Sequence, residues 1–210
     1  MSTLLRQDAA GDVIRIDQQL IADMVEPGTR VLDVGCGDGA LLEYLQTFRQ
    51  VDGRGIELSQ AGVNACVAAG LSVIQGDADT DLRDYPDNAF DYAILGLTLQ
   101  ATHDPKGVLE QLLRVGHRAI VSFPNFAHWT VRWRILFGGH MPTTPALPYK
   151  WYDTPNIHLC TIDDFRDLCR EIGVVIERQI ILDRHARQII VPPALANLIG
   201  QHGLFLLRKA

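Results

Sequence analysis

The stretch VLDVGCGDG, residues 31–39, constrains the fold of this 210-residue chain more than any other. A short apolar run leads directly into three glycines that alternate with small or acidic residues. Glycine-rich turns of this kind connect a buried strand to a helix in doubly wound α/β folds, where the backbone approaches a ligand closely. The stretch therefore predicts a strand over residues 30–34, then a ligand-binding turn, then a helix that begins near Ala40.

The rest of the chain alternates strand-like and helix-like segments, as a helix-covered parallel sheet requires. We expect helices near residues 13–24, 40–47, 59–69, 105–115 and 161–172, and strands near 30–34, 53–57, 71–75, 90–95, 118–123, 174–182 and 204–208. Residues 189–207 contain no Asp, Glu, Lys or Arg, but their prolines and glycines favour a loop and then a buried strand over a membrane span. The pattern predicts one α/β domain over residues 1–210.

Composition limits the partners and the cell compartment. Acidic residues outnumber basic ones by 25 to 19, and the chain has no long basic run, so nucleic acid is not an expected partner. The four cysteines, Cys36, Cys66, Cys160 and Cys169, form no C-x-x-C pair, which predicts neither disulfides nor a metal site. Charged residues interrupt the N-terminal segment, so we expect a cytoplasmic protein that does not associate with membranes.

Carboxylates gather at or just after the ends of successive expected strands. They are Asp33, Asp38, Glu57, Asp77 and Asp79, and the glycine turn holds no Lys or Arg. The turn also satisfies the relaxed dinucleotide pattern, with Glu57 twenty residues after Gly37. A pyrophosphate would nevertheless be repelled by these charges. S-adenosylmethionine has no phosphate, and offers two cationic groups for the carboxylates, a ribose diol for Glu57 and an adenine amine for Asp77. The charges therefore favour this cofactor, and a nicotinamide cofactor is the alternative.

Four motifs resemble those of class I S-adenosylmethionine-dependent methyltransferases. They are VLDVGCGDG, GIELS, GDAD and FDYAILGLTLQ, in this order within residues 30–100. The resemblance implies a Rossmann-like α/β fold with a seven-stranded, mostly parallel sheet, helices on both faces, and a last strand that is antiparallel and matches residues 204–208. It also implies that S-adenosylmethionine or S-adenosylhomocysteine is bound.

The same resemblance assigns the cofactor-binding residues. Asp33, Gly35 and Gly37 would surround the methionine end, Glu57 would bind the ribose, Asp77 and Ala78 would lie at the adenine, and the backbone of Leu95, Gly96 and Leu97 would lie beneath the cofactor. The other expected cofactor-binding residues are Cys36, Asp38 and Leu58.

A narrower resemblance covers nearly the whole chain. The segments LTLQATHDP, LRVGHRAIVSFPNFAHW and GGHMPTTPALPYKWYDTPNIHLCTIDDF are similar to the MetW family of methionine biosynthesis proteins. The family implies a role beside homoserine O-acyltransferase, whereas methyl transfer is an inference from the fold. We therefore rank a cofactor-binding subunit that supports this acyltransferase first, an active methyltransferase on a small-molecule acceptor second, and an NAD-dependent oxidoreductase third.

The cap segment, residues 124–160, follows the fifth expected strand and should lie over the site. Eight of the fifteen aromatic residues fall within residues 123–153, which suits either a small core of its own or an acceptor pocket or partner surface. Catalytic residues are harder to assign, because no recognisable catalytic set is present. The weak candidates are Asn125, His128 and Gln100, with His103, His140 and His158 behind them.

Overall fold

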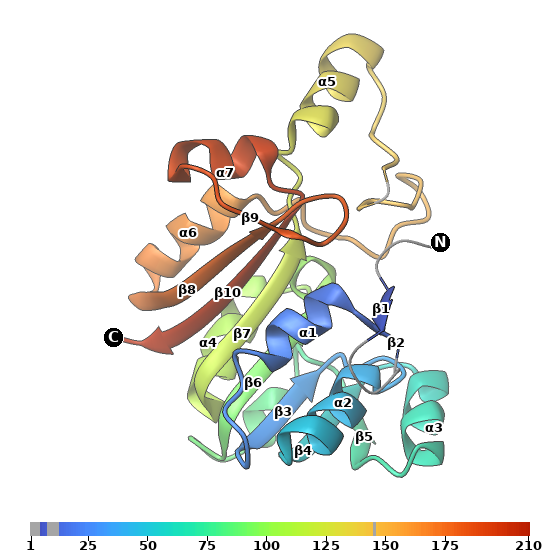
Figure 1. The fold of residues 1–210 in the computed structure, drawn as a ribbon, viewed down its shortest axis with the longest axis vertical. Coiled ribbons are helices and arrows are strands. Elements are labelled where there is room, and N and C mark those ends of the chain that lie inside the picture. Colours follow the sequence, from blue (N-terminus) through green and yellow to red (C-terminus); the bar gives the residue numbers. More distant parts are fainter. Residues whose placement is uncertain (1–4, 8–12, 145) are drawn as a thin grey trace.

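The computed structural model describes residues 5–7, 13–144 and 146–210. Its centre is an eight-stranded sheet with the order β5-β4-β3-β6-β7-β10-β8-β9 (Figure 1). The parallel strands are β3 (Arg30–Val34), β4 (Asp52–Glu57), β5 (Val73–Gln75), β6 (Phe90–Gly96) and β7 (Gly116–Pro124). The antiparallel part comprises β8 (Val174–Leu182), β9 (Gln188–Ile189) and β10 (His202–Lys209).

The α/β class, the mostly parallel sheet and the antiparallel last strand are confirmed. The strand count of seven was too low by one, because the chain turns back after β8 and adds the two-residue strand β9 at the edge of the sheet. A separate hairpin, β1 (Leu5–Gln7) with β2 (Val13–Arg15), precedes the first helix.

Helices cover both faces of the sheet. One face carries α1 (Ile16–Ala22), α2 (Ala40–Arg49) and α3 (Gln60–Ala68), and the other carries α4 (Pro105–Val115) and α6 (Ile162–Glu171). Strand alternation divides the core between them: Val31 packs with α1 and α2, whereas Leu32 and Val34 pack with α4 and α6. Two short 3-10 helices, η1 (Asp81–Asp84) and η2 (Leu99–Ala101), follow β5 and β6.

Helix starts follow local sequence signals. The side chain of Asp104 accepts a hydrogen bond from the Gly107 amide at the start of α4, directly before Pro105. Thr161 does the same for the Asp164 amide at the start of α6, as its capping sequence predicts.

Three helical segments differ from the sequence-based expectation. The first helix begins at Ile16 rather than residue 13, because residues 13–15 pair as β2. Two further helices, α5 (Trp129–Gly138) and α7 (Pro193–Ile199), occupy segments that were expected to be connections. The apolar side chains of α5 are distributed around the helix, so its sequence shows no one-sided apolar pattern. None of the helices in the described ranges is long and apolar enough to cross a membrane.

The cap segment leaves the sheet after β7 and projects beyond the carboxyl ends of the parallel strands, with α5 at its far end (Figure 1). The last part of the cap segment is hydrogen-bonded to η2, because the Gln100 carbonyl accepts hydrogen bonds from the amides of Ile157 (2.8 Å) and His158 (3.0 Å). The cap is therefore anchored directly to the loop that follows β6.

Candidate cofactor-binding site

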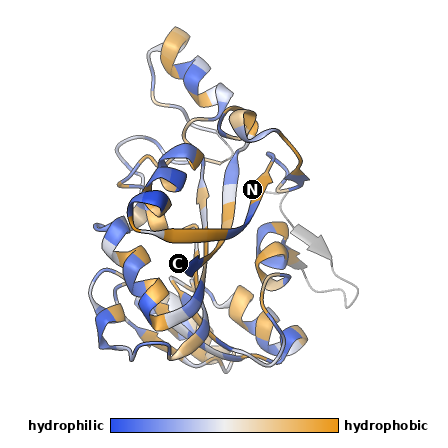
Figure 2. Ribbon diagram, turned by 90° about the vertical axis from the view of Figure 1, so that its left-hand side faces the viewer, coloured by the Kyte–Doolittle hydropathy of each residue, from blue (hydrophilic) through white to orange (hydrophobic). Residues whose placement is uncertain are grey.

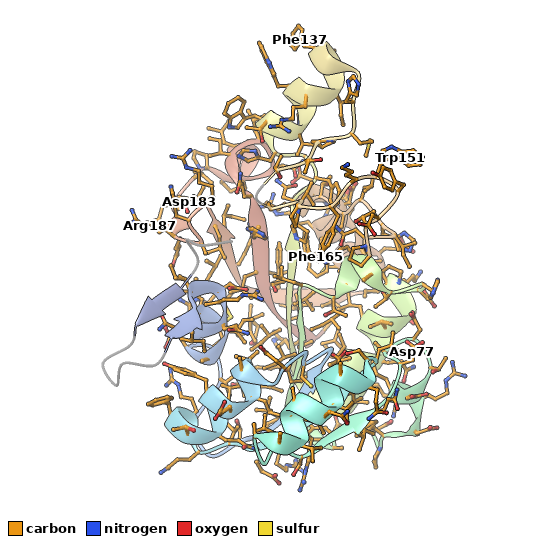
Figure 3. All side chains as sticks on the ribbon, turned by 90° about the vertical axis from the view of Figure 1, so that its right-hand side faces the viewer. Asp77, Phe137, Trp151, Phe165, Asp183 and Arg187 are labelled. Atoms are coloured by element: carbon orange, nitrogen blue, oxygen red, sulfur yellow. The ribbon has the colours of Figure 1, made fainter. Side chains whose placement is uncertain are left out.

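The predicted cofactor-binding residues lie at the carboxyl ends of four neighbouring strands, β5, β4, β3 and β6. The structure therefore brings them together along one edge of the sheet, where ligands bind in doubly wound folds. Figure 3 shows Asp77, from the loop after β5, on the same side of the molecule as Trp151, with the tip of α5 at Phe137 beyond both.

The glycine turn between β3 and α2 depends on left-handed backbone. Gly35, Gly37 and Gly39 have φ values of 73°, 61° and 83°. A Cβ on Gly35 would approach the Thr98 hydroxyl oxygen to 2.7 Å, so this glycine is required for packing. A Cβ on Gly37 would meet nothing within 4 Å. The turn is thus closely packed at Gly35 and has open space beside Gly37, where a ligand can approach the backbone.

Glu57 is held in place by this turn. One of its carboxylate oxygens accepts a hydrogen bond from the Gly37 amide and the other from the Ser59 amide, both at 2.9 Å. Each oxygen keeps a further lone pair, so the positioned carboxylate can accept two more hydrogen bonds, as a ribose diol requires.

Asp33 is the most unusual acid of the site. Its side chain is 3% exposed, and no described residue donates a hydrogen bond to it. Burial, and then the nearby charge of Glu57, raise the pKa of Asp33 to about 7. A buried carboxylate without a donor is costly when ionised, and a bound cation would offset that cost.

The other acids accept hydrogen bonds from backbone amides. Asp38 accepts from the Ala40 amide at the start of α2, and Asp77 accepts from the Asp79 amide. Asp79 joins two loops, because its oxygens accept from the amides of His103 and Asp104, each at 2.9 Å.

The remaining predicted residues differ in what they expose. Leu58 is exposed, Ala78 is half-buried, and the side chain of Leu95 lies wholly in the core, so Leu95 can offer only its backbone. Leu97 has a φ of 55°, and its amide donates to the Ser122 carbonyl and hydroxyl oxygens. The Cys36 thiol lies 3.9 Å from that of Cys66, and burial raises the pKa of both.

The three weak catalytic candidates have different surroundings. The Asn125 amide nitrogen donates to the carbonyls of Asn197 and Gly200, which ties the end of β7 to α7. His128 caps α5 through Thr130, and burial lowers its pKa. Gln100 donates to the Leu97 carbonyl at 2.6 Å, but its side-chain oxygen is buried without a hydrogen-bond partner among the described residues. Gln100 is thus the candidate with a free acceptor.

One charged group near the turn was missed in the sequence. Arg15 pairs with the buried Asp17 through Nε at 3.0 Å, and the charge of Asp38 also acts on it. Burial, and to a smaller extent the charge of Arg15, lower the pKa of His202. No local signal places Arg15 near the turn, since Asp38 and His202 lie far from it in the sequence. Asp17 neutralises Arg15, so the surroundings of the turn stay acidic. Within the described ranges, no three His, Cys, Asp or Glu side chains are placed to hold a metal ion.

The amino-acid sequence is similar to those of known proteins. The family described as "Methionine biosynthesis protein MetW" matches residues 15–207. The bifunctional methionine biosynthesis protein MetXA/MetW of Rhodopirellula baltica is 35% identical over 194 residues, which cover 88% of this chain and 31% of that protein. This chain thus spans about a third of the bifunctional relative. A demethylmenaquinone methyltransferase of Paenarthrobacter aurescens is 28% identical over 174 residues, covering 77% of this chain and 67% of that protein.

Solved structures support the fold. A putative methyltransferase of Haloferax volcanii, in complex with a methyltransferase activator, superposes with a TM-score of 0.66 at 16% identity and covers 91% of this chain and 88% of that chain. A TehB-like S-adenosylmethionine-dependent methyltransferase of Corynebacterium glutamicum gives 0.61 at 18% identity, covering 96% and 91%. At such identities these likenesses establish the fold alone. Because the family match extends over almost the entire chain, this protein belongs to the MetW family of methionine biosynthesis proteins.

Proposed function

We propose that this chain binds S-adenosylmethionine, or its demethylated product S-adenosylhomocysteine, at the carboxyl ends of β3, β4 and β5. The observation that carries the proposal is the buried, donor-free carboxylate of Asp33 beside a positioned Glu57. Asp33 suits the cationic methionine end, Glu57 the ribose hydroxyls and Asp77 the adenine amine. The same acidic surroundings disfavour a pyrophosphate, and hence the nicotinamide alternative.

We further propose that the chain supports homoserine O-acyltransferase in methionine biosynthesis. The relative from Rhodopirellula baltica carries the names MetXA and MetW on one polypeptide. Joining two domains in one chain gives each a high effective concentration near the other, which favours a pair that works together. A MetX-like acyltransferase is therefore the partner that we assign to this chain.

Methyl transfer to a small-molecule acceptor is the second candidate. Bound S-adenosylmethionine supplies an electrophilic methyl group. The side-chain oxygen of Gln100, in η2 after β6, is buried and unpaired among the described residues, so an acceptor hydroxyl or amine could bind it only after a local movement exposes it. Nothing comparable marks Asn125 or His128, whose side chains bind neighbouring segments.

We expect Glu57→Ala to weaken S-adenosylmethionine binding by roughly 1.5 to 3 kcal/mol, because charge-assisted hydrogen bonds to the ribose are lost. Isothermal titration calorimetry measures the change. Glu43→Ala is the matched control, since Glu43 is an exposed acid in the first turn of α2 and its removal changes the net charge equally. Equal affinity of both variants would show that the ribose does not bind Glu57.

Mixing this chain with purified homoserine O-acyltransferase should give a complex at micromolar concentration and raise the activity or thermal stability of the enzyme. Analytical ultracentrifugation detects the complex, and an acyl-transfer assay with and without this chain detects the effect. An absence of association, or association without any change in the enzyme, would contradict the support role. The methyltransferase candidate would then rank first.

A further inference from the structure

Helix α5 has little contact with the rest of the protein. Val131 is its one buried residue, and residues 132–140 are all exposed. Figure 1 shows the helix projecting at one end of the molecule, and Figure 3 shows Phe137 at its tip, pointing away from the body. The helix is therefore accessible on nearly all sides.

Most large hydrophobic side chains of α5 are exposed, and Figure 2 shows hydrophobic residues at the projecting end of the ribbon. The exposed fractions of Trp133, Leu136 and Phe137 are 60%, 75% and 65%, and the rings of Trp133 and Phe137 lie 4.2 Å apart. An isolated helix of ten residues is marginal in water, and an exposed apolar cluster of this kind marks an interaction surface. A partner that covers α5 would both bury these rings and stabilise the helix.

Charge indicates what kind of partner fits. The cap segment carries Arg132, Arg134 and Lys150 against a single acid, Asp153, whereas the whole chain has a formal net charge of −6. Arg132 and Arg134 lie on α5 among the apolar residues and are exposed. A symmetric pairing of two α5 helices would place these arginines against each other. The complementary surface is therefore an apolar groove with an acidic rim and not a second α5 helix.

We propose that α5 is the segment that docks into homoserine O-acyltransferase, with Trp133, Leu136 and Phe137 in an apolar groove and the two arginines facing acids at its rim. This inference rests on the proposed association with that enzyme. Tryptophan and phenylalanine suit such an anchor, because they bury a large area for few rotatable bonds.

The test measures the affinity of the full chain for purified acyltransferase by biolayer interferometry. Trp133→Ala should weaken binding about 30-fold, the scale of a central aromatic anchor, while alanine preserves the helix. Val67→Ala is the matched control, because Val67 is 58% exposed on the distant helix α3 and its replacement should leave affinity unchanged.

The double variant Arg132→Gln with Arg134→Gln should slow association with the acyltransferase at low salt and reduce the salt dependence of the association rate. Unchanged S-adenosylmethionine affinity of each variant confirms that it is folded.

Each alternative to this role of α5 predicts a different experimental result. If wild type and Trp133→Ala bind the acyltransferase equally, the association stands and the docking role of α5 is wrong. If wild type does not bind at all, the proposed support function itself fails. A dimer of this chain alone that Trp133→Ala dissociates would assign the helix to self-association. Binding to phosphatidylserine vesicles that Trp133→Ala abolishes, with acyltransferase binding unaffected, would assign it to a membrane surface.

Discussion

Gly37→Val should fold and lose measurable binding of S-adenosylmethionine. The added side chain enters open space, since nothing lies within 4 Å of a Cβ at this position, and the φ of 61° adds a strain of about 1 to 2 kcal/mol. The valine would occupy the space in which the ligand must approach the turn backbone. Calorimetry should therefore give no binding signal, while thermal unfolding stays cooperative at a slightly lower temperature.

A matched control separates strain from loss of the site. Gly28 also has a left-handed φ, 75°, with nothing within 4 Å of an added Cβ, but it precedes β3 at the opposite end of the strand. Gly28→Val should lose similar stability and keep full affinity. Native affinity in Gly37→Val would mean that the ligand does not contact this turn.

Asp33→Asn should stabilise the ligand-free protein above neutral pH. The folded pKa of Asp33 is about 7 against an ordinary 3.8, so the folded state binds a proton more tightly than the unfolded chain. Stability from this group is therefore present at low pH and is lost as the pH rises from about 4 to 7. At pH 8 the variant should be more stable than wild type by on the order of 2 to 4 kcal/mol, with little difference at pH 4. Urea unfolding at both pH values measures this, and equal stabilities at pH 8 would mean that Asp33 is not strained when ionised.

The same substitution should weaken cofactor binding. A cationic ligand favours the ionised carboxylate, so binding below pH 7 must release a proton from Asp33. Wild-type affinity should therefore fall up to tenfold per pH unit below about 7, and Asp33→Asn should lose this dependence. Calorimetry in two buffers of different ionisation enthalpy counts the released proton. If no proton is released at pH 6, Asp33 does not face the cations of the ligand.

The order of strands and helices along the chain was largely predictable from sequence. β3, the glycine turn and the start of α2 follow from an apolar run, residues that tolerate left-handed backbone, and a helix former at Ala40. α4 and α6 follow from caps and one-sided apolar spacing. These signals act between residues a few positions apart, so the sequence contains them completely. The parallel arrangement then places Asp33, Glu57 and Asp77 at one edge, because every crossover returns the chain to the same end of the sheet.

What each acid does at that edge was decided by tertiary structure. Asp33, Glu57 and Asp79 look alike in sequence, yet one is buried without a donor, one is held by the glycine turn, and one joins two loops. The partners of Asp79 lie more than twenty residues away, and the two carbonyls that accept from the Asn125 amide nitrogen lie more than seventy residues away. Such hydrogen bonds exist only after the strands have been brought together, so no local pattern predicts them.

The exposure of the cap-segment aromatic residues was also decided by tertiary structure. The aromatic residues of the cap segment were visible in the sequence, but whether they form a small core or a surface depends on what packs against them. Trp129 and Trp133 are 53% and 60% exposed, because α5 leaves the body of the protein instead of folding onto it. Trp151, in the returning part of the cap segment, is 74% exposed. Apolar residues on every side of α5 hid the helix from a periodicity search, and Pro192 with Pro193 suggested a loop where α7 begins. Local sequence thus determined most strands and helices and the end of the sheet at which the predicted site lies. Long-range packing determined which side chains are left free to bind a ligand or a partner.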